Sequence, residues 1–239
     1  MSRPLALIAG FGPGISSSMA NKLASKGYNL ALLSRTQSKL DAAAASLASK
    51  YGNTTKGFTV DLADPSQIAS KLPDIKASFG PSARVGILFY NGVGSYVTGG
   101  KGLLRGADSQ DLSNAFNVSV GSLVAATRAL EKDLVASKGA VLVTGGILEL
   151  DNDPITKYTV SKGKDVMAVS MAAKRKTVSL LHHALKDKGV FVGGVTVMKA
   201  VQGTPMDGTG KSDLTPDMVA NKFEELYVKR DAIFVKIGA

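Results

Sequence analysis

Short apolar runs alternate along the chain with longer segments in which apolar and charged residues are mixed. Several of these runs are continuous rather than alternating, which is typical of strands buried on both faces of a parallel sheet. The predicted strands are residues 5–9, 28–34, 57–61, 85–91, 140–144, 190–197 and 233–237. The predicted helices are residues 16–26, 37–51, 65–79, 109–137, about 156–188, and 216–229. This order predicts an α/β fold with a doubly wound parallel sheet.

The same pattern predicts one domain over residues 1–239, because no linker, repeat or low-complexity tract divides it. Two glycine-rich loops, Gly92–Gly106 and Gly203–Asp213, follow predicted strands, and we expect both to be mobile. Ligands of open α/β sheets bind beyond the carboxyl ends of the strands. These loops are therefore expected to line the substrate pocket.

The first predicted strand leads directly into a glycine-rich turn, Gly10–Ser16, and a helical segment follows. Glycine lets backbone amides approach a ligand closely without a side-chain clash. The helix behind the turn directs unpaired N–H groups toward whatever the turn holds, which favours a phosphate. The turn therefore predicts a nucleotide cofactor.

Composition narrows the remaining chemistry. The chain has 239 residues and no cysteine, which excludes disulfides, thiolate nucleophiles and cysteine metal sites. His182 and His183 are adjacent, and neighbours on a helix point in different directions, so no metal site is predicted. The sequence shows no signal-peptide pattern and no apolar run long enough to span a membrane, so a cytoplasmic protein without a membrane partner is expected.

The formal net charge of +10 suits either nucleic acid or anionic small molecules. The basic residues are scattered along predicted helices among acidic ones, without an arginine-rich tract. We therefore predict no nucleic-acid partner and assign the charge to anionic cofactors and substrates.

Polar residues at three further strand ends sharpen the cofactor prediction. The second strand ends in Ser34 and Arg35, and this hydroxyl and guanidinium suit a 2′-phosphate better than the acidic residue that pairs with a free ribose. The third strand ends in Asp61, whose carboxylate could contact an adenine edge. The fourth ends in the turn Asn91–Gly94. Together these residues predict NADP(H).

These motifs resemble the short-chain dehydrogenase/reductase family over essentially the whole chain. Gly10-x-x-x-Gly14-x-Ser16 resembles its glycine motif, and Asn91-Gly92-Val93-Gly94 resembles its Asn-Ala-Gly turn. The resemblance implies a seven-stranded parallel sheet flanked by helices, a homodimer or homotetramer, and a carbonyl or alcohol substrate. It implies these cofactor-binding residues: Gly10, Gly12, Gly14, Ile15, Ser34, Arg35, Asp61, Leu62, Asn91, Gly92 and Lys162.

The family's catalytic pair is a tyrosine with a lysine four residues later, and Tyr158 and Lys162 have that spacing. A lysine one helical turn away can lower the pKa of a tyrosine that protonates a developing alkoxide. The family's serine would fall at position 145, which is glycine here, so Thr144 is the candidate replacement. The family's asparagine is replaced by Ser119.

A second register remains open. The family has about 22 residues between its tyrosine and the glycine before the sixth strand, whereas 31 separate Tyr158 from Gly189. If the extra residues precede the helix, Met167 and Met171 take the places of the tyrosine and the lysine. The stretch Ser170–Lys174 is a third alternative, with serine in the place of tyrosine.

Thr144-Gly145-Gly146 after the fifth strand and a later Gly203-Thr204-Pro205 are similar to a divergent branch of the family. The sequence thus predicts an NADP(H)-dependent oxidoreductase that transfers a hydride between nicotinamide and a carbonyl or alcohol. The alternative is an NADP(H)-binding sensor or scaffold without catalysis.

Overall fold

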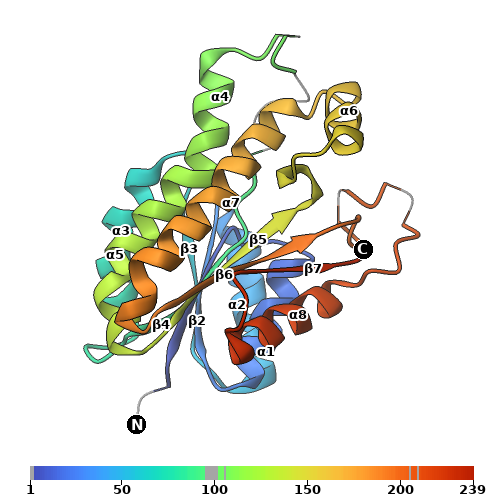
Figure 1. Ribbon diagram of the computed structural model, residues 1–239. Helices are drawn as coiled ribbons and strands as arrows, with labels where there is room; N and C mark the ends of the chain where they lie inside the picture. Colours follow the sequence, from blue (N-terminus) through green and yellow to red (C-terminus); the bar gives the residue numbers. More distant parts are fainter. Residues whose placement is uncertain (1–2, 95–101, 105, 205, 209) are drawn as a thin grey trace.

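The chain forms one seven-stranded parallel sheet with the strand order β3-β2-β1-β4-β5-β6-β7 (Figure 1). The computed structural model describes residues 3–94, 102–104, 106–204, 206–208 and 210–239. The predicted mobility of the two glycine-rich loops falls partly on residues outside these ranges. The strands are β1 Leu5–Ala9, β2 Asn29–Ser34, β3 Thr55–Thr59, β4 Val85–Tyr90, β5 Ala140–Gly146, β6 Phe191–Val197 and β7 Phe234–Ile237.

From β1 to β3 each new strand is added on one side of the sheet, and from β4 to β7 each new strand is added on the other side. The neighbours β1 and β4 mark the point where the order reverses. Because all strands are parallel, their carboxyl ends lie along one edge, and a crevice opens where the order reverses. The predicted doubly wound sheet is therefore confirmed. The five residues of β1 are all buried, as their unbroken apolar sequence indicated.

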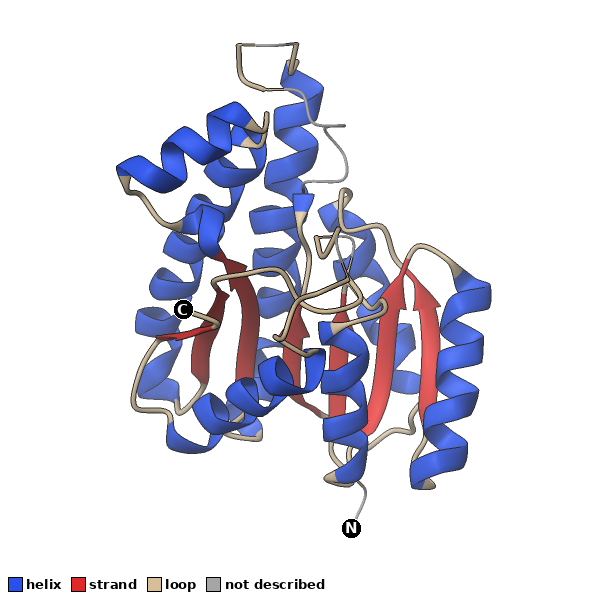
Figure 2. Cartoon of the chain, turned by 90° about the vertical axis from the view of Figure 1, so that its right-hand side faces the viewer, coloured by secondary structure: helices blue, strands red, loops and turns tan. Residues whose placement is uncertain are grey.

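Helices cover both faces of the sheet (Figures 1 and 2). Side chains of α1, α2 and α8 pack in one apolar cluster against one face, and those of α3, α5 and α7 pack in a second cluster against the other. Odd and even positions of β1 contribute to different clusters, as the alternation of side chains along a strand requires. The helices are α1 Ile15–Ser25, α2 Gln37–Tyr51, α3 Pro65–Ala77, α4 Ser109–Phe116, α5 Ser122–Ala136, α6 Asp153–Ser161, α7 Asp165–Leu185 and α8 Pro216–Lys229.

Two long helices predicted from the sequence are interrupted. The segment 109–137 contains a π-helical turn, Asn117–Gly121, between α4 and α5. The single helix predicted over about 156–188 is wrong, because α6 ends at Ser161 and α7 begins at Asp165. Gly163 between them has a φ of 59°, a left-handed conformation that stops the first helix. The helix α6 is thus a separate element that stands beyond the carboxyl edge of the sheet (Figure 1).

The third strand begins and ends two residues earlier than predicted. It runs from Thr55 to Thr59, so Asp61 lies in the loop that follows the strand and not at its last position. Its burial decreases from the buried Thr55 to the exposed Thr59, and β3 is an edge strand. This placement lets Asp61 lie over the carboxyl edge.

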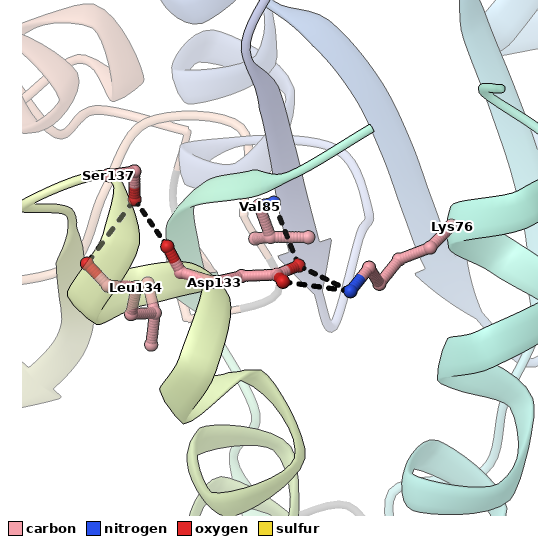
Figure 3. Close-up of polar contacts among 5 residues, drawn as sticks. All are labelled: Lys76, Val85, Asp133, Leu134 and Ser137. Carbon is pink, nitrogen blue, oxygen red and sulfur yellow. Dashed lines mark hydrogen bonds and ion pairs between the residues drawn. The ribbon is translucent and has the colours of Figure 1, made fainter. Parts of the chain in front are cut away.

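A polar network holds the opposite, amino edge of the sheet (Figure 3). The Asp133 carboxylate of α5 accepts hydrogen bonds from the Lys76 amine of α3 at 2.8 Å and from the backbone N–H of Val85 at 3.2 Å. The Ser137 hydroxyl donates to the carbonyl of Asp133 at 2.8 Å. One carboxylate therefore joins two helices to the start of β4, on the side of the sheet away from the cavity described next.

Candidate cofactor and active site

A continuous cavity of about 840 Å³ lies along the carboxyl edge of the sheet. Its near half is formed by the glycine-rich turn and the ends of β2, β3 and β4. Its far half is formed by the end of β5, the segment after β6, and helices α6 and α7. The predicted cofactor residues that line it are Gly10, Gly12, Ile15, Ser34, Arg35, Asp61, Leu62, Asn91 and Gly92.

The glycine-rich turn is fixed to the end of β4. Gly10 has a φ of 79°, and a Cβ there would lie 2.9 Å from the carbonyl carbon of Asn91, so only glycine fits. The buried Ser16 hydroxyl donates to the Gly10 carbonyl at 2.9 Å and accepts from the Asn91 side-chain amide at 2.7 Å. This chain of bonds sets the position of the turn before any ligand binds.

The turn leaves space where a phosphate would approach. A Cβ at Gly12 would meet nothing within 4 Å, so the backbone there faces open cavity. Gly14 is the N-cap of α1, has a φ of 92° and carries no capping side chain. The first N–H groups of α1 are therefore available to an anion. Gly14 itself is not among the cavity-lining residues; a Cβ there would lie 2.9 Å from the Thr204 methyl group.

The ends of β2 and β3 provide the polar groups of the near half. Ser34 is the last residue of β2, the exposed Arg35 follows it, and both line the cavity. One oxygen of Asp61 accepts a hydrogen bond from the Ala63 backbone N–H at 3.0 Å, which orients the carboxylate. A cation, a hydroxyl, a carboxylate and an open glycine turn fit a nucleotide with an additional phosphate.

The far half contains Tyr158 but not Lys162. Tyr158 lies on α6, lines the cavity and is 46% exposed. Lys162 follows the last residue of α6, is exposed, and is not among the described lining residues. The cation near Tyr158 is instead Lys164, whose Nζ lies 5.8 Å from the ring centroid.

The two other predicted catalytic positions differ in placement. Ser119 is fully buried and donates a hydrogen bond to the Ser170 hydroxyl at 3.2 Å, and neither serine is among the described lining residues. Thr144 does line the cavity, and its buried hydroxyl has no hydrogen-bond partner. Because side chains alternate along β5, Thr144 points to the face opposite Gly145.

Two methionines of α7 line the cavity where the second register places the tyrosine and the lysine. Met167 and Met171 lie about one helical turn from each other, and both line the cavity. They are 6% and 5% exposed, respectively. The nine residues between the first and second registers cover the end of α6, the turn that follows it and the start of α7. Met167 and Met171 therefore face the far half of the cavity together with Tyr158, while Ser170 and Lys174 of the third alternative lie behind its wall.

A buried ionic cluster fills the space beside Gly145. The Glu149 carboxylate accepts hydrogen bonds from Arg175 at 2.8 Å and from the Thr196 hydroxyl at 2.5 Å. A Cβ at Gly145 would overlap this carboxylate. The carboxylate thus occupies the place of the side chain that position 145 lacks.

Lys174 is a buried cation in the same region. Its amine donates to the Gly92 carbonyl at 2.9 Å, and the residue is 1% exposed. Burial lowers the pKa of this amine to about 8, although the Glu149 charge acts in the opposite direction. Lys174 is not among the described lining residues, so it supports the Gly92 turn from behind.

Sequence reasoning missed much of the far wall. The residues it did not identify there are Gly146, Ile147, Leu148, Pro154, Ile155, Val197, Met198, Lys199, Ala200 and Val201, whereas Thr204 and Met206 belong to the loop Gly203–Asp213 that was expected to line the pocket. It also missed Glu149 and Arg175. The distance from Gly189 back to Met167 was the signal that pointed to the α7 part of this wall.

Two classes of feature are absent from the part of the chain that the structure describes. Its histidine, aspartate and glutamate residues form no group of three that could hold a metal ion. None of its helices combines the length and the apolar character needed to cross a membrane.

The sequence is similar to one protein family and to individual proteins of known name. The family model described as short chain dehydrogenase matches residues 4–207. A very-long-chain 3-oxoacyl-CoA reductase of Phaeosphaeria nodorum is 55% identical over 60 residues, which are 24% of this chain and 18% of that protein. The reductase of the same name from Neurospora crassa is 30% identical over 191 residues, which are 78% of this chain and 53% of that protein. The chain thus spans about half the length of this longer match.

Solved structures share the fold at low sequence identity. The NADPH-bound structure of a short chain oxidoreductase from Pseudomonas aeruginosa PAO1, described as containing an atypical catalytic center, superposes with a TM-score of 0.78. The two sequences are 16% identical, and the match covers 100% of this chain and 97% of that one. At this identity the likeness shows the arrangement of the sheet and helices.

Proposed function

The chain belongs to the short-chain dehydrogenase family, and from that premise we propose that it is an NADP(H)-dependent oxidoreductase acting on a carbonyl or alcohol. The observation that carries the proposal is the continuous cavity that joins Arg35 and the glycine turn to Tyr158. A cofactor held in the near half would extend toward the far half, where a substrate would meet it.

The near half supplies the cofactor contacts. The open backbone at Gly12 and the first N–H groups of α1 bind the pyrophosphate. Arg35 and Ser34 bind the 2′-phosphate, because a guanidinium gains a charge-assisted partner there that the free ribose lacks. Asp61 and Leu62 hold the adenine. Asn91 and Gly92 keep the end of β4 in place beside the nicotinamide end.

The far half supplies the proton. The bound cofactor provides or accepts the hydride. Tyr158 is the cavity-lining phenol, and we assign it the transfer of the proton to or from the substrate oxygen. The Lys164 ammonium lies near the Tyr158 ring, and the apolar wall of the far half lies beside this tyrosine. Lys162, which the sequence placed in this role, acts only if the turn after α6 moves toward the cavity.

The NADP(H) preference is tested by the variant Arg35→Asp. NADPH is expected to raise the Tm of the wild type more than NADH at equal concentration, and the variant is expected to reverse this order. A lost charge-assisted contact corresponds to roughly a 10- to 100-fold weaker Kd for NADPH. Lys176→Asp, on the exposed side of α7, changes the net charge equally and should keep the preference. Equal increases of the wild-type Tm with NADPH and with NADH would refute the assignment of Arg35 to the 2′-phosphate.

The role of Tyr158 is tested by Tyr158→Phe. Loss of general acid catalysis is expected to lower kcat about 100-fold or more on aliphatic aldehydes and ketones. NADPH should stabilise the variant as it does the wild type, because the phenol lies outside the near half. Tyr51→Phe, whose hydroxyl contacts Asn21 away from the cavity, is the control. Full activity of Tyr158→Phe would remove the assignment.

A second candidate function is an NADP(H)-binding protein that performs no reaction. The methionines at 167 and 171 and the Glu149 carboxylate beside Gly145 favour it, because these places lack the family's proton-transfer groups. The Pseudomonas protein described as having an atypical center binds NADPH, so an altered catalytic half is compatible with the fold. NADPH binding without turnover on a broad substrate panel would establish this second function.

The relatives suggest one substrate to include in that panel. They are named very-long-chain 3-oxoacyl-CoA reductases, and the apolar far wall suits a long acyl chain. We therefore propose a 3-oxoacyl thioester as the first carbonyl to test. The cytoplasmic location and the homo-oligomeric state expected from the sequence stay predictions.

A further inference from the structure

We propose that Glu149 is a positioning residue whose buried carboxylate sets the width of the far half and thereby limits the size of the group beside the substrate carbonyl. The selection of a substrate rests on the proposed oxidoreductase function, whereas the positioning of the wall does not. The inference follows from the hydrogen bonds that the carboxylate accepts, from the wall residues next to its partners, and from a close contact within that wall.

The carboxylate joins three elements of the fold. Glu149 ends the short 3₁₀ turn that follows β5, Arg175 lies on α7 and Thr196 lies on β6. The Glu149 Oε1 atom accepts hydrogen bonds from Arg175 Nη1 at 2.8 Å and from the Thr196 hydroxyl at 2.5 Å. Arg175 Nη1 also donates to the Thr196 hydroxyl oxygen at 3.0 Å. Each bond of this triangle fixes the distance between two elements.

Each of the three elements also carries part of the far wall. Leu148 immediately precedes the carboxylate, Val197 immediately follows the threonine, and Met171 lies about one helical turn before the arginine. All three line the cavity, whereas no member of the cluster is among the described lining residues. The cluster therefore acts on a ligand through the wall, and we assign it no catalytic role.

The wall has no spare width where two of these elements meet. Gly146, the last residue of β5, lines the cavity, and a Cβ there would lie 3.0 Å from the terminal methyl carbon of Met171. Two carbon atoms in favourable contact are about 3.5–4.0 Å apart, so the end of β5 and α7 approach as closely as a glycine allows. The bonds of Glu149 join the same two elements and thus keep the far half narrow.

The cluster is suited to placing the wall more than to stabilising the fold. The Glu149 side chain is 2% exposed, and the desolvation of a buried carboxylate offsets much of its attraction to a cation. Hydrogen bonds do impose distances and angles that apolar packing does not impose. The far side of Arg175 is also held, because its guanidinium carbon lies 3.8 Å from the centroid of the Phe234 ring of β7.

The positioning role is tested by NMR of protein labelled with methyl-¹³C methionine, without added ligand. Glu149→Leu accepts no hydrogen bond, so we expect the Met171 methyl resonance, assigned with Met171→Leu, to shift and broaden. Thr196→Val removes only the bond to β6 and should shift the same resonance less, and it serves as the test if Glu149→Leu does not fold. Glu149→Gln keeps an oxygen that can accept both bonds and should retain the wild-type resonance.

Asp133→Leu is the matched control for a general loss of stability. Asp133 is also a carboxylate that joins separate elements, but it lies at the opposite edge of the sheet (Figure 3). Its variant should leave the Met171 resonance in place. An unchanged resonance in both Glu149→Leu and Thr196→Val, or an equal change in Asp133→Leu, would overturn the positioning role.

Substrate selection is tested with NADPH and two ketones, the linear 2-heptanone and the tert-butyl ketone pinacolone. A wider far half in Glu149→Leu and Thr196→Val should lower the ratio of kcat/KM for the linear over the branched ketone about tenfold, the discrimination that one methylene gives in an apolar pocket. Glu149→Gln and Asp133→Leu should keep the wild-type ratio. An unchanged ratio in the first two variants would overturn the size selection. A wild type that reduces neither ketone would count against the proposed function and the size selection together, and the methyl spectra would then decide the positioning role alone.

Discussion

The near and far halves of the cavity are built in opposite ways. The near half consists of a backbone turn and short polar side chains that follow directly after strands, and local hydrogen bonds such as Ser16 to Gly10 hold it. The far half consists of side chains from four separate segments, and behind its wall, beside Gly145, lies a cluster that joins Glu149, Arg175 and Thr196. Cofactor recognition here depends on a local motif, whereas the reaction depends on distant packing.

This difference explains why the two halves can change independently. The near half contains nine of the eleven cofactor-binding residues that the family resemblance implies, from the glycine turn to Gly92. The far half contains Tyr158 and two methionines of α7, and the position expected for the family's serine is Gly145. Three experiments can break or sharpen this comparison.

The largest effect is expected from two alanine variants of the glycine turn. Gly10→Ala forces a left-handed φ on alanine and presses its Cβ against Asn91, so it should lower the free energy of unfolding by about 3 kcal/mol. Gly12→Ala meets no atom within 4 Å and should leave stability unchanged. Both should weaken NADPH binding. Denaturant unfolding and cofactor titration of the two variants measure these effects, and equal stabilities would contradict the fixed-turn interpretation.

The second effect is a pH dependence of stability that originates behind the cavity. The pKa of Lys174 is lowered from 10.5 to about 8 in the folded protein, so between these values the unfolded chain binds more protons. Stability from this group therefore rises with pH, by about 1.4 kcal/mol per pH unit at most. Lys174→Met should remove this rise.

The difference between wild type and Lys174→Met isolates the contribution, because other titrating groups are common to both proteins. Urea unfolding from about pH 7 to about pH 9.5 measures it. Lys162→Met, which changes an exposed lysine, should keep the wild-type dependence. Parallel profiles for wild type and Lys174→Met would mean that burial does not shift this amine.

The smallest of the three effects comes from restoring a side chain beside the Glu149 cluster. Gly145→Ser should cost about 2 kcal/mol, because the new side chain overlaps the Glu149 carboxylate. Gly208→Ser, where a Cβ meets nothing within 4 Å, is the control. Calorimetric or chemical unfolding measures the cost. A neutral Gly145→Ser would show that the carboxylate moves easily and that the far half is less rigid than its bonds indicate.

The sequence was sufficient for the sheet and for the near half because their signals are local. An unbroken apolar run such as Leu5–Ala9 marks a doubly covered strand, and the glycine turn directly follows it. The break at Gly163 was missed because an isolated glycine within a helical pattern does not by itself end a helix. The merged prediction then placed Tyr158 and Lys162 on one helix face.

The far half depends on contacts between distant positions. Glu149 meets Arg175 and Thr196, which are 26 and 47 residues further along the chain. No periodicity or short motif in a single sequence reports such a pairing. Only the count of residues back from Gly189 indicated that Met167 and Met171 face the cavity.

The carboxylate beside Gly145 also limits the routes by which this chain could change. A serine at 145 overlaps Glu149, while shortening Glu149 first leaves the buried ends of Arg175 and Thr196 without their acceptor. Each single step therefore passes through a less stable intermediate, since breaking a buried ion pair costs about 3–5 kcal/mol. A serine can therefore be introduced at position 145 without loss of stability only together with a second replacement that removes the Glu149 cluster.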